Sequence, residues 1–201
     1  MEKEKLLDIK DLSVTYKTED GIVYAVNNMN LTLEPKETLG FVGETGAGKT
    51  TTAMTIMGLL PTPPGKVTSG EIMFDGKDML KIGDKERRGI LGEKISMIFQ
   101  DPMTSLNPSM KVGDQIVEMI RLHKVIGKKE AFEEACGLLE MVGIRRERAN
   151  DYPHQFSGGM KQRVVIAIAL ACRPKMIIAD EPTTALDVTI QAQVMNLIKG
   201  L

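Results

Sequence analysis

The stretch Gly43-Glu44-Thr45-Gly46-Ala47-Gly48-Lys49-Thr50 decides the fold of this chain, because it has the form G-x-x-x-x-G-K-[ST] of a phosphate-binding loop. Its glycines let backbone N–H groups turn toward phosphate oxygens. Lys49 supplies a positive charge, and Thr50 supplies a hydroxyl group for Mg²⁺. The loop is therefore predicted to bind a polyphosphate.

The segments on either side of the loop support this prediction. Thr38–Val42 is expected to form a short buried strand, and Thr51 to Leu60 a helix. Strand, loop and helix in this order are the arrangement that confirms such a motif. The helix N-terminus adds free N–H donors and a partial positive charge of roughly +0.5.

Length and composition exclude several classes of protein. The 201 residues fit one domain, and 42% hydrophobic residues suffice for a substantial core. A net charge of −1 gives no electrostatic reason to expect nucleic acid as a partner. The N-terminus lacks the apolar core of a signal peptide, and the longest apolar run, Val164 to Cys172, is too short to span a bilayer. We expect a cytoplasmic chain, in which Cys136 and Cys172 are ordinary apolar residues.

The remaining pattern separates into β and helical regions. Leu12, Val14 and Tyr16 alternate with polar residues, which predicts an antiparallel β region near the N-terminus. Later segments are expected as a strand at Glu71–Phe74, an inserted helical subdomain from about Asp101 to Gln155, a helix at Gly158–Ala171, a strand at Lys175–Ala179 and a last helix at Val188–Lys199. No internal repeat is present.

Two carboxylates follow the apolar run Met176–Ala179, which is typical of a buried parallel strand. Asp180 is predicted to reach Mg²⁺, usually through water, and Glu181 to act as the general base on the attacking water. By themselves the two residues would better fit a strand that stops at a solvated turn. The upstream phosphate-binding loop favours the catalytic interpretation.

Two further side chains are weaker candidates. Gln100 follows the apolar run Ile95–Phe99, so its amide could coordinate Mg²⁺ or position water, although a structural glutamine is the alternative. The ring of Tyr16 could stack on adenine, although a tyrosine packed on its own sheet is the alternative. His154 is expected to be a local hydrogen-bonding group near Ser157.

A second motif, Phe156-Ser157-Gly158-Gly159-Met160, narrows the class of nucleotide-binding protein. With the other motifs it makes the whole chain resemble the ATP-binding subunit of an ABC transporter. Tyr16 matches the A-loop aromatic residue of that family, Gln100 the Q-loop and Asp187 the D-loop. The octapeptide matches Walker A, Asp180-Glu181 the end of Walker B, and the second motif the signature. Phe and Met replace the common Leu and Gln of the signature, but Ser-Gly-Gly is intact.

The resemblance implies an α/β fold with a P-loop NTPase (RecA-like) core, a mainly parallel sheet, an N-terminal antiparallel β region and an inserted helical subdomain. Residues 1–201 would form one ABC-type nucleotide-binding domain, with residues 1–100 and 158–201 in the core and 101–157 in the helical subdomain. ATP and Mg²⁺ are the implied cofactors. Thr50, Gln100 and Asp180 would hold the metal, and residues from Gly43 to Thr51 the nucleotide.

The resemblance also implies partners. Two such subunits sandwich two ATP molecules, so that Ser157, Gly158, Gly159 and Met160 would face the γ-phosphate bound by the other subunit. The segments Phe99–Pro108 and Tyr152–Gln155 resemble the dipeptide, oligopeptide and nickel importer branch, and Met103-Thr104 its D-type subunit. This implies a heterodimeric ATPase pair, two transmembrane permease subunits and an extracytoplasmic solute-binding protein. Peptide is the expected substrate class and nickel the alternative, with the chain on the cytoplasmic face of the membrane.

Three other readings compete with this one. A non-transport ABC ATPase would share most motifs, but the chain has no sustained heptads and no basic stripe. A GTPase or kinase would leave Ser157, Gly158, Gly159 and Asp187 unexplained. A degenerate partner subunit would have no need of Glu181 or Ser157.

The family carries a switch-loop histidine after the D-loop, whereas both histidines of this chain, His123 and His154, precede Asp187. We therefore expect a domain truncated at its C-terminus, which binds ATP but hydrolyses it poorly.

Overall fold

A computed structural model describes residues 4–99, 101–182 and 191–192. The chain separates into two compact units, Met1–Arg88 and Gly89–Leu201, and each unit is described by itself. Among the described residues, no helix has both the length and the apolar character needed to cross a lipid bilayer.

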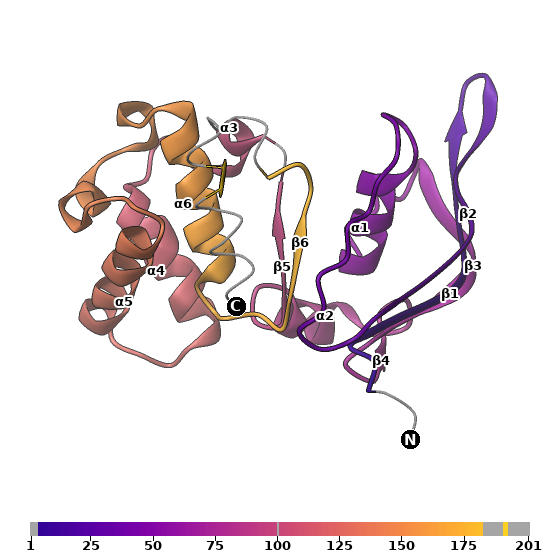
Figure 1. The fold of residues 1–201 in the computed structure, drawn as a ribbon, viewed down its shortest axis with the longest axis horizontal. Helices are drawn as coiled ribbons and strands as arrows, with labels where there is room; N and C mark the ends of the chain where they lie inside the picture. Colours follow the sequence, from indigo (N-terminus) through magenta and orange to yellow (C-terminus); the bar gives the residue numbers. More distant parts are fainter. Residues whose placement is uncertain (1–3, 100, 183–190, 193–201) are drawn as a thin grey trace. The chain divides into compact units, whose positions relative to one another are not determined.

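The first unit is built on an antiparallel sheet of four strands in the order β2-β1-β3-β4 (Figure 1). The strands are β1 (Leu7–Thr18), β2 (Gly21–Leu33), β3 (Gly65–Phe74) and β4 (Lys77–Asp78). Leu12 and Val14 of β1 are completely buried, whereas the intervening Ser13 is not. This alternation confirms the predicted N-terminal antiparallel region, and β3 begins six residues earlier than the expected strand at Glu71.

Helix α1 (Lys49–Met57) begins within the phosphate-binding loop and contacts β2. It buries Ala53, Ile56 and Met57. It ends at Met57, three residues before the expected end at Leu60, and the N–H of the following Gly58 donates to the carbonyl oxygens of Met54 and Thr55. Helix α2 (Asp84–Ile90) follows β4.

The expected buried strand at Thr38–Val42 is wrong for this structure. The segment has no regular secondary structure, and its apolar side chains are exposed, Val42 at 94% of its surface. A strand needs a neighbour that accepts its backbone hydrogen bonds. The sheet of the first unit pairs β1 to β4 only with one another, and the apolar pattern of the sequence cannot supply a missing neighbour.

The second unit combines a parallel pair of strands with a group of helices (Figure 1). Strands β5 (Ile95–Ile98) and β6 (Met176–Ala179) pair in register, with Ile95 opposite Met176 and Ile98 opposite Ala179. The helices are α3 (Pro102–Ser105), α4 (Val112–His123), α5 (Lys128–Met141), η1 (Arg146–Asn150), η2 (Pro153–Gln155) and α6 (Gly158–Leu170). All regular elements that the structure describes between residues 101 and 157 are thus helical, as expected.

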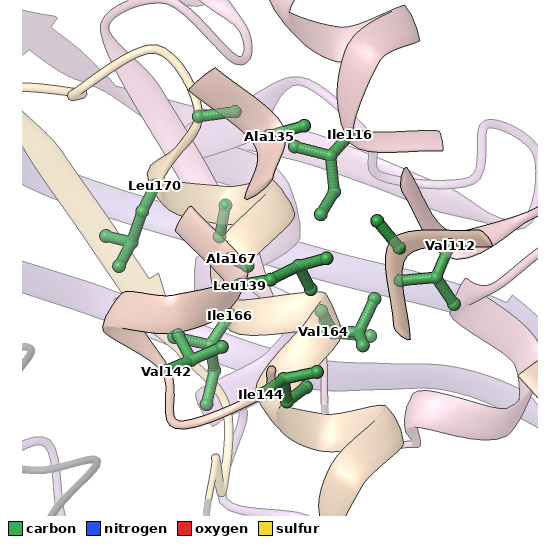
Figure 2. Packing of buried hydrophobic residues seen from close by; sticks show 14 of the residues in the cluster. Val112, Ile116, Ala135, Leu139, Val142, Ile144, Val164, Ile166, Ala167 and Leu170 are labelled. Carbon is green, nitrogen blue, oxygen red and sulfur yellow. The ribbon is translucent and has the colours of Figure 1, made fainter. Parts of the chain in front are cut away.

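The core of the second unit lies where α4, α5 and α6 meet. Figure 2 shows Ile116, Leu139 and Val164 converging from these three helices, and each of the three is completely buried. Because burying such a side chain contributes about 1.5–3 kcal/mol, this packing holds α6 firmly in the unit. The subdomain boundaries at residues 101 and 157 stay a prediction, and the expected last helix, Val188–Lys199, lies outside the described residues.

Candidate functional site

Gly48 places the phosphate-binding loop against the sheet of the first unit. Its φ of 80° lies in the left-handed region, and a Cβ atom built on it would lie 2.2 Å from the carbonyl oxygen of Ala25 in β2. No side chain fits at that distance, so only glycine allows the loop to approach the strand so closely. The final glycine of the motif is therefore required for packing as well as for the loop conformation.

The Lys49 side chain folds back over the loop. Its Nζ donates to the carbonyl oxygens of Gly43 at 2.6 Å and Glu44 at 3.0 Å. These bonds hold the ammonium group at the start of α1, where the helix already presents free N–H donors. The loop therefore concentrates positive charge and N–H donors at one end of a helix, which fits an anionic polyphosphate.

Tyr16 lies beside the same helix. Its hydroxyl group is 3.4 Å from Oγ1 of Thr51, and Tyr16 is half-buried in β1. The structure thus brings the predicted adenine-binding aromatic residue to the first turn of α1, although 35 positions separate Tyr16 from Thr51. Stacking of the ring on adenine stays a prediction.

The two carboxylates follow β6 in the second unit. The backbone N–H of Asp180 donates to the carbonyl oxygen of Ile98 at 3.0 Å, so the pairing with β5 continues one residue past the strand. Glu181 has a φ of 49°, in the left-handed region that a glutamate rarely adopts. Its side chain is exposed, so it is accessible to a substrate or a water molecule.

The signature motif forms the beginning of α6. Ser157 is the N-cap, and its Oγ accepts a hydrogen bond from the Met160 N–H at 3.4 Å. Gly158, Gly159 and Met160 are the first residues of the helix, where N–H groups have no intrahelical acceptor. This end of α6 therefore offers N–H donors and a partial positive charge, as a phosphate contact requires.

The segment before Ser157 is held by a residue that the sequence does not single out. The Arg148 guanidinium lies 4.5 Å from the centre of the Phe156 ring and donates to the Gln155 carbonyl oxygen at 2.9 Å. Arg148 also pairs with Asp151. Phe156, the departure from the common signature leucine, thus serves as the ring of a cation–π contact. No local spacing signals such a contact, because the partners come from different elements.

For several residues of the sequence analysis, the structure adds little to the predicted role. Gln100 and Asp187 lie outside the described residues, so their roles stay predictions. His154 stacks on Tyr152 with ring centres 5.8 Å apart.

Burial raises the pKa of both the Cys136 and the Cys172 thiol, which favours the unreactive protonated form and fits the absence of a predicted role. Among the residues that the structure describes, no three His, Cys, Asp or Glu side chains gather in a group that could hold a metal ion.

Comparison with known proteins extends these findings. Residues 26–184 match the family described as ABC transporter. The chain is 55% identical over 199 residues to the oligopeptide transport ATP-binding protein OppD of Bacillus subtilis (strain 168), a match that covers 98% of this chain and 56% of that protein. It is 54% identical over 200 residues to the dipeptide transport ATP-binding protein DppD of the same organism, with 98% and 60% covered. The chain thus spans well under two thirds of the length of these relatives.

A solved structure supports the fold. The dimeric post-hydrolysis state of the ATP-binding cassette MJ0796, bound to ADP and Pi, superimposes with a TM-score of 0.87 at 32% identity. The match covers 96% of this chain and 81% of that one. The α/β architecture with a P-loop NTPase core is therefore confirmed.

Proposed function

The chain belongs to the ABC transporter family, and we propose that it is the subunit that binds and hydrolyses ATP in an importer of di- and oligopeptides. The observation that carries this proposal is the start of α1, where Gly48 packs on β2 and Lys49 holds its charge over the phosphate-binding loop. The family membership then selects ATP among the polyphosphates. The peptide class follows from relatives that are named as oligopeptide and dipeptide transport proteins.

Nucleotide binding would use the first unit. The Lys49 ammonium and the backbone N–H groups of residues 43–51 would neutralise the phosphate oxygens, and Tyr16 would stack on the adenine ring. Thr50 and Asp180, with Gln100, would hold Mg²⁺, which when bound neutralises charge on the β- and γ-phosphates. When the nucleotide binds, the Lys49 ammonium would donate to phosphate oxygens in place of the carbonyl oxygens of Gly43 and Glu44.

Hydrolysis would use Glu181. Its carboxylate would accept a proton from a water molecule as the water oxygen forms a bond to the γ-phosphorus. The bond between that phosphorus and the β–γ bridging oxygen breaks, and ADP and phosphate leave. The exposed side chain at the end of β6 is accessible for this role.

The signature would act on a second subunit. Ser157 caps α6, and the free N–H groups of Gly158 and Gly159 would contact a γ-phosphate bound by the partner, with Met160 beside it. ATP binding would thus close a dimer, and hydrolysis would reopen it. Asp187 would contribute to that interface.

The assembly follows from the same premise. We propose a heterodimeric pair of ATPase subunits on the cytoplasmic face of the membrane, in contact with two permease subunits and, through them, an extracytoplasmic solute-binding protein. The permease subunits and the solute-binding protein would select the solute. The choice between peptide and nickel as substrate is therefore tested by uptake assays on the assembled transporter.

The Glu181→Gln substitution tests the proposal in the protein as it is naturally produced. Losing the general base should lower kcat for ATP roughly 10²- to 10⁴-fold and leave a stable ATP-bound dimer. Steady-state phosphate release and light scattering measure the two effects. An unchanged rate would reject Glu181 as the base.

Lys49→Ala is the companion variant. It should weaken ATP binding in an equilibrium titration, whereas Lys85→Ala, an exposed lysine of α2, should leave binding unchanged. Equal competition by GTP and ATP would point to a different class of nucleotide-binding protein.

A further inference from the structure

A buried glutamine of α6 contacts the segment that follows Glu181. Gln162 is 1% exposed, and its Nε2 donates to the carbonyl oxygen of Pro182 at 2.9 Å. Only the amide nitrogen can donate to a carbonyl oxygen, which fixes the orientation of the amide group. Both residues belong to the second unit, so the contact lies within one compact body.

This contact completes a pair of anchors around Glu181. On one side, the Asp180 N–H donates to Ile98 of β5 at 3.0 Å. On the other side, the Pro182 carbonyl accepts the hydrogen bond of Gln162. Glu181 lies between them with a φ of 49°. A glutamate stays in this sparsely populated conformation only when its surroundings impose it, and the two anchors restrain the backbone on both sides of Glu181.

The same glutamine is attached to the helix that carries the signature. Gln162 follows Ser157 by five residues, which is about 7.5 Å along the axis at 1.5 Å per residue. The buried side chains of Val164, Ile166 and Ala167 pack α6 into the core, so the helix behaves as a rigid element (Figure 2). A displacement at Ser157 therefore reaches the Pro182 carbonyl through one helix and one hydrogen bond.

We propose that Gln162 is a positioning residue, which holds Glu181 in its catalytic conformation and couples that conformation to the signature end of α6. The proposal rests on the proposed function of Glu181 as the base. It adds a physical connection between the end of the chain's own β6 and the surface on which the partner's phosphate would bind.

Stability alone does not account for a glutamine at this position. Gln162 Oε1 is buried and has no hydrogen-bond partner among the residues that the structure describes. A buried acceptor without a partner destabilises the folded state, and a methionine of similar length would avoid that loss. The bond that the amide donates to Pro182 is what a methionine at this position would lose.

Gln162→Met tests the proposal in the natural protein assembled with its partners. The variant keeps the length of the side chain and removes the donor. We expect kcat for Mg²⁺-ATP to fall about tenfold or more while KM and the equilibrium ATP affinity stay within about twofold, the signature of a change confined to the chemical step.

Arg163→Met is the matched control. Arg163 is the next residue of α6, donates to the carbonyl oxygens of Val142 and Gly143, and has a buried Nε without a described partner. Its loss should lower stability and leave kcat within about twofold, because its described hydrogen bonds go to Val142 and Gly143 and not to Pro182. Equal losses of kcat in the two variants would overturn the proposal and assign both residues a general structural role.

A double variant tests whether Gln162 acts through Glu181. In the Glu181→Gln background, Gln162→Met should not lower the single-turnover rate further, since the base is already absent. An additive loss, or a normal kcat for Gln162→Met alone, would overturn the proposal. If Gln162→Met does not fold, Gln162→Asn, which is one methylene too short to reach Pro182, takes its place. Failure of both variants to fold would show a structural role and also overturn the proposal.

The same measurements separate this inference from the proposed function. Suppose that the wild type hydrolyses ATP, that Glu181→Gln is inactive and that Gln162→Met has a normal kcat. This result would reject only the positioning role of Gln162. Absence of ATP hydrolysis by the wild type would reject the proposed function.

Discussion

Two glycines of the phosphate-binding loop share a backbone conformation but differ in what surrounds them. Gly46 and Gly48 have φ values of 86° and 80°. A Cβ atom on Gly46 would meet nothing within 4 Å, whereas one on Gly48 would lie 2.2 Å from the Ala25 carbonyl oxygen. The pair therefore separates the conformational requirement of the loop from its packing against β2.

We expect Gly48→Ala to be much more damaging than Gly46→Ala. The Gly46 variant should lose about 1–2 kcal/mol of unfolding free energy, the cost of a left-handed alanine. The Gly48 variant must also move the loop away from β2, which should bring the loss to roughly 3 kcal/mol or more and abolish ATP binding. Urea unfolding and an ATP titration check both. Equal losses would mean that the contact with Ala25 does not restrain the loop.

At the scale of elements, the N-terminus of α6 has two roles that can be tested apart. Ser157 stabilises the helix through its bond from the Met160 N–H, and it is also the proposed phosphate contact. An aspartate makes an equally good N-cap and interacts favourably with the helix dipole, but it repels a phosphate.

Ser157→Asp should therefore keep the helix and lose the function. Its unfolding free energy should equal or exceed that of the wild type, whereas Ser157→Ala should lose about 1 kcal/mol. In the Glu181→Gln background, the aspartate variant should fail to form the ATP-bound dimer that light scattering detects. An ATP-bound dimer of normal stability would show that Ser157 does not face a phosphate.

At the scale of the whole molecule, stability depends on pH through ion pairs on the N-terminal sheet. Asp8 of β1 accepts hydrogen bonds from Lys5 at 3.0 Å and from the Thr32 hydroxyl of β2 at 2.9 Å. The bond from Lys5 and that from Thr32, together with the charges of Lys5 and Lys10, lower the pKa of the Asp8 carboxyl group against the opposing effect of burial. Its side chain is 13% exposed, so solvent screens these interactions only in part.

The stabilisation from Asp8 should disappear in acid. Because the folded-state pKa lies below the ordinary aspartate value of about 3.9, the contribution is fully present above that pH and is lost as pH falls through the lowered pKa. Asp8→Asn should thus cost roughly 0.5–1 kcal/mol at pH 7 and almost nothing once the pH lies below the lowered pKa of Asp8. Urea unfolding across this range measures it. Lys5→Met should remove part of the same contribution to the unfolding free energy. A difference in unfolding free energy between Asp8→Asn and the wild type that stays constant at all pH values would reject the ion-pair explanation.

The sequence by itself determined the features that depend on neighbours in the chain. The loop Gly43–Thr50, the helix that it starts, the strand before Asp180 and the helix at Gly158–Ala171 were all predicted, because turn chemistry and periodicity are local properties. The order of these motifs also identified the family.

The tertiary structure alone decided which distant residues meet. The Gln162 bond to Pro182, the Arg148 contact with Phe156 and the approach of Tyr16 to Thr51 join separate elements and leave no trace in local spacing. The exposure of Val42 has the same origin, since an apolar run becomes a strand only if a neighbouring backbone accepts its hydrogen bonds. Such contacts depend on how the chain closes its loops and packs its helices, which local patterns do not encode.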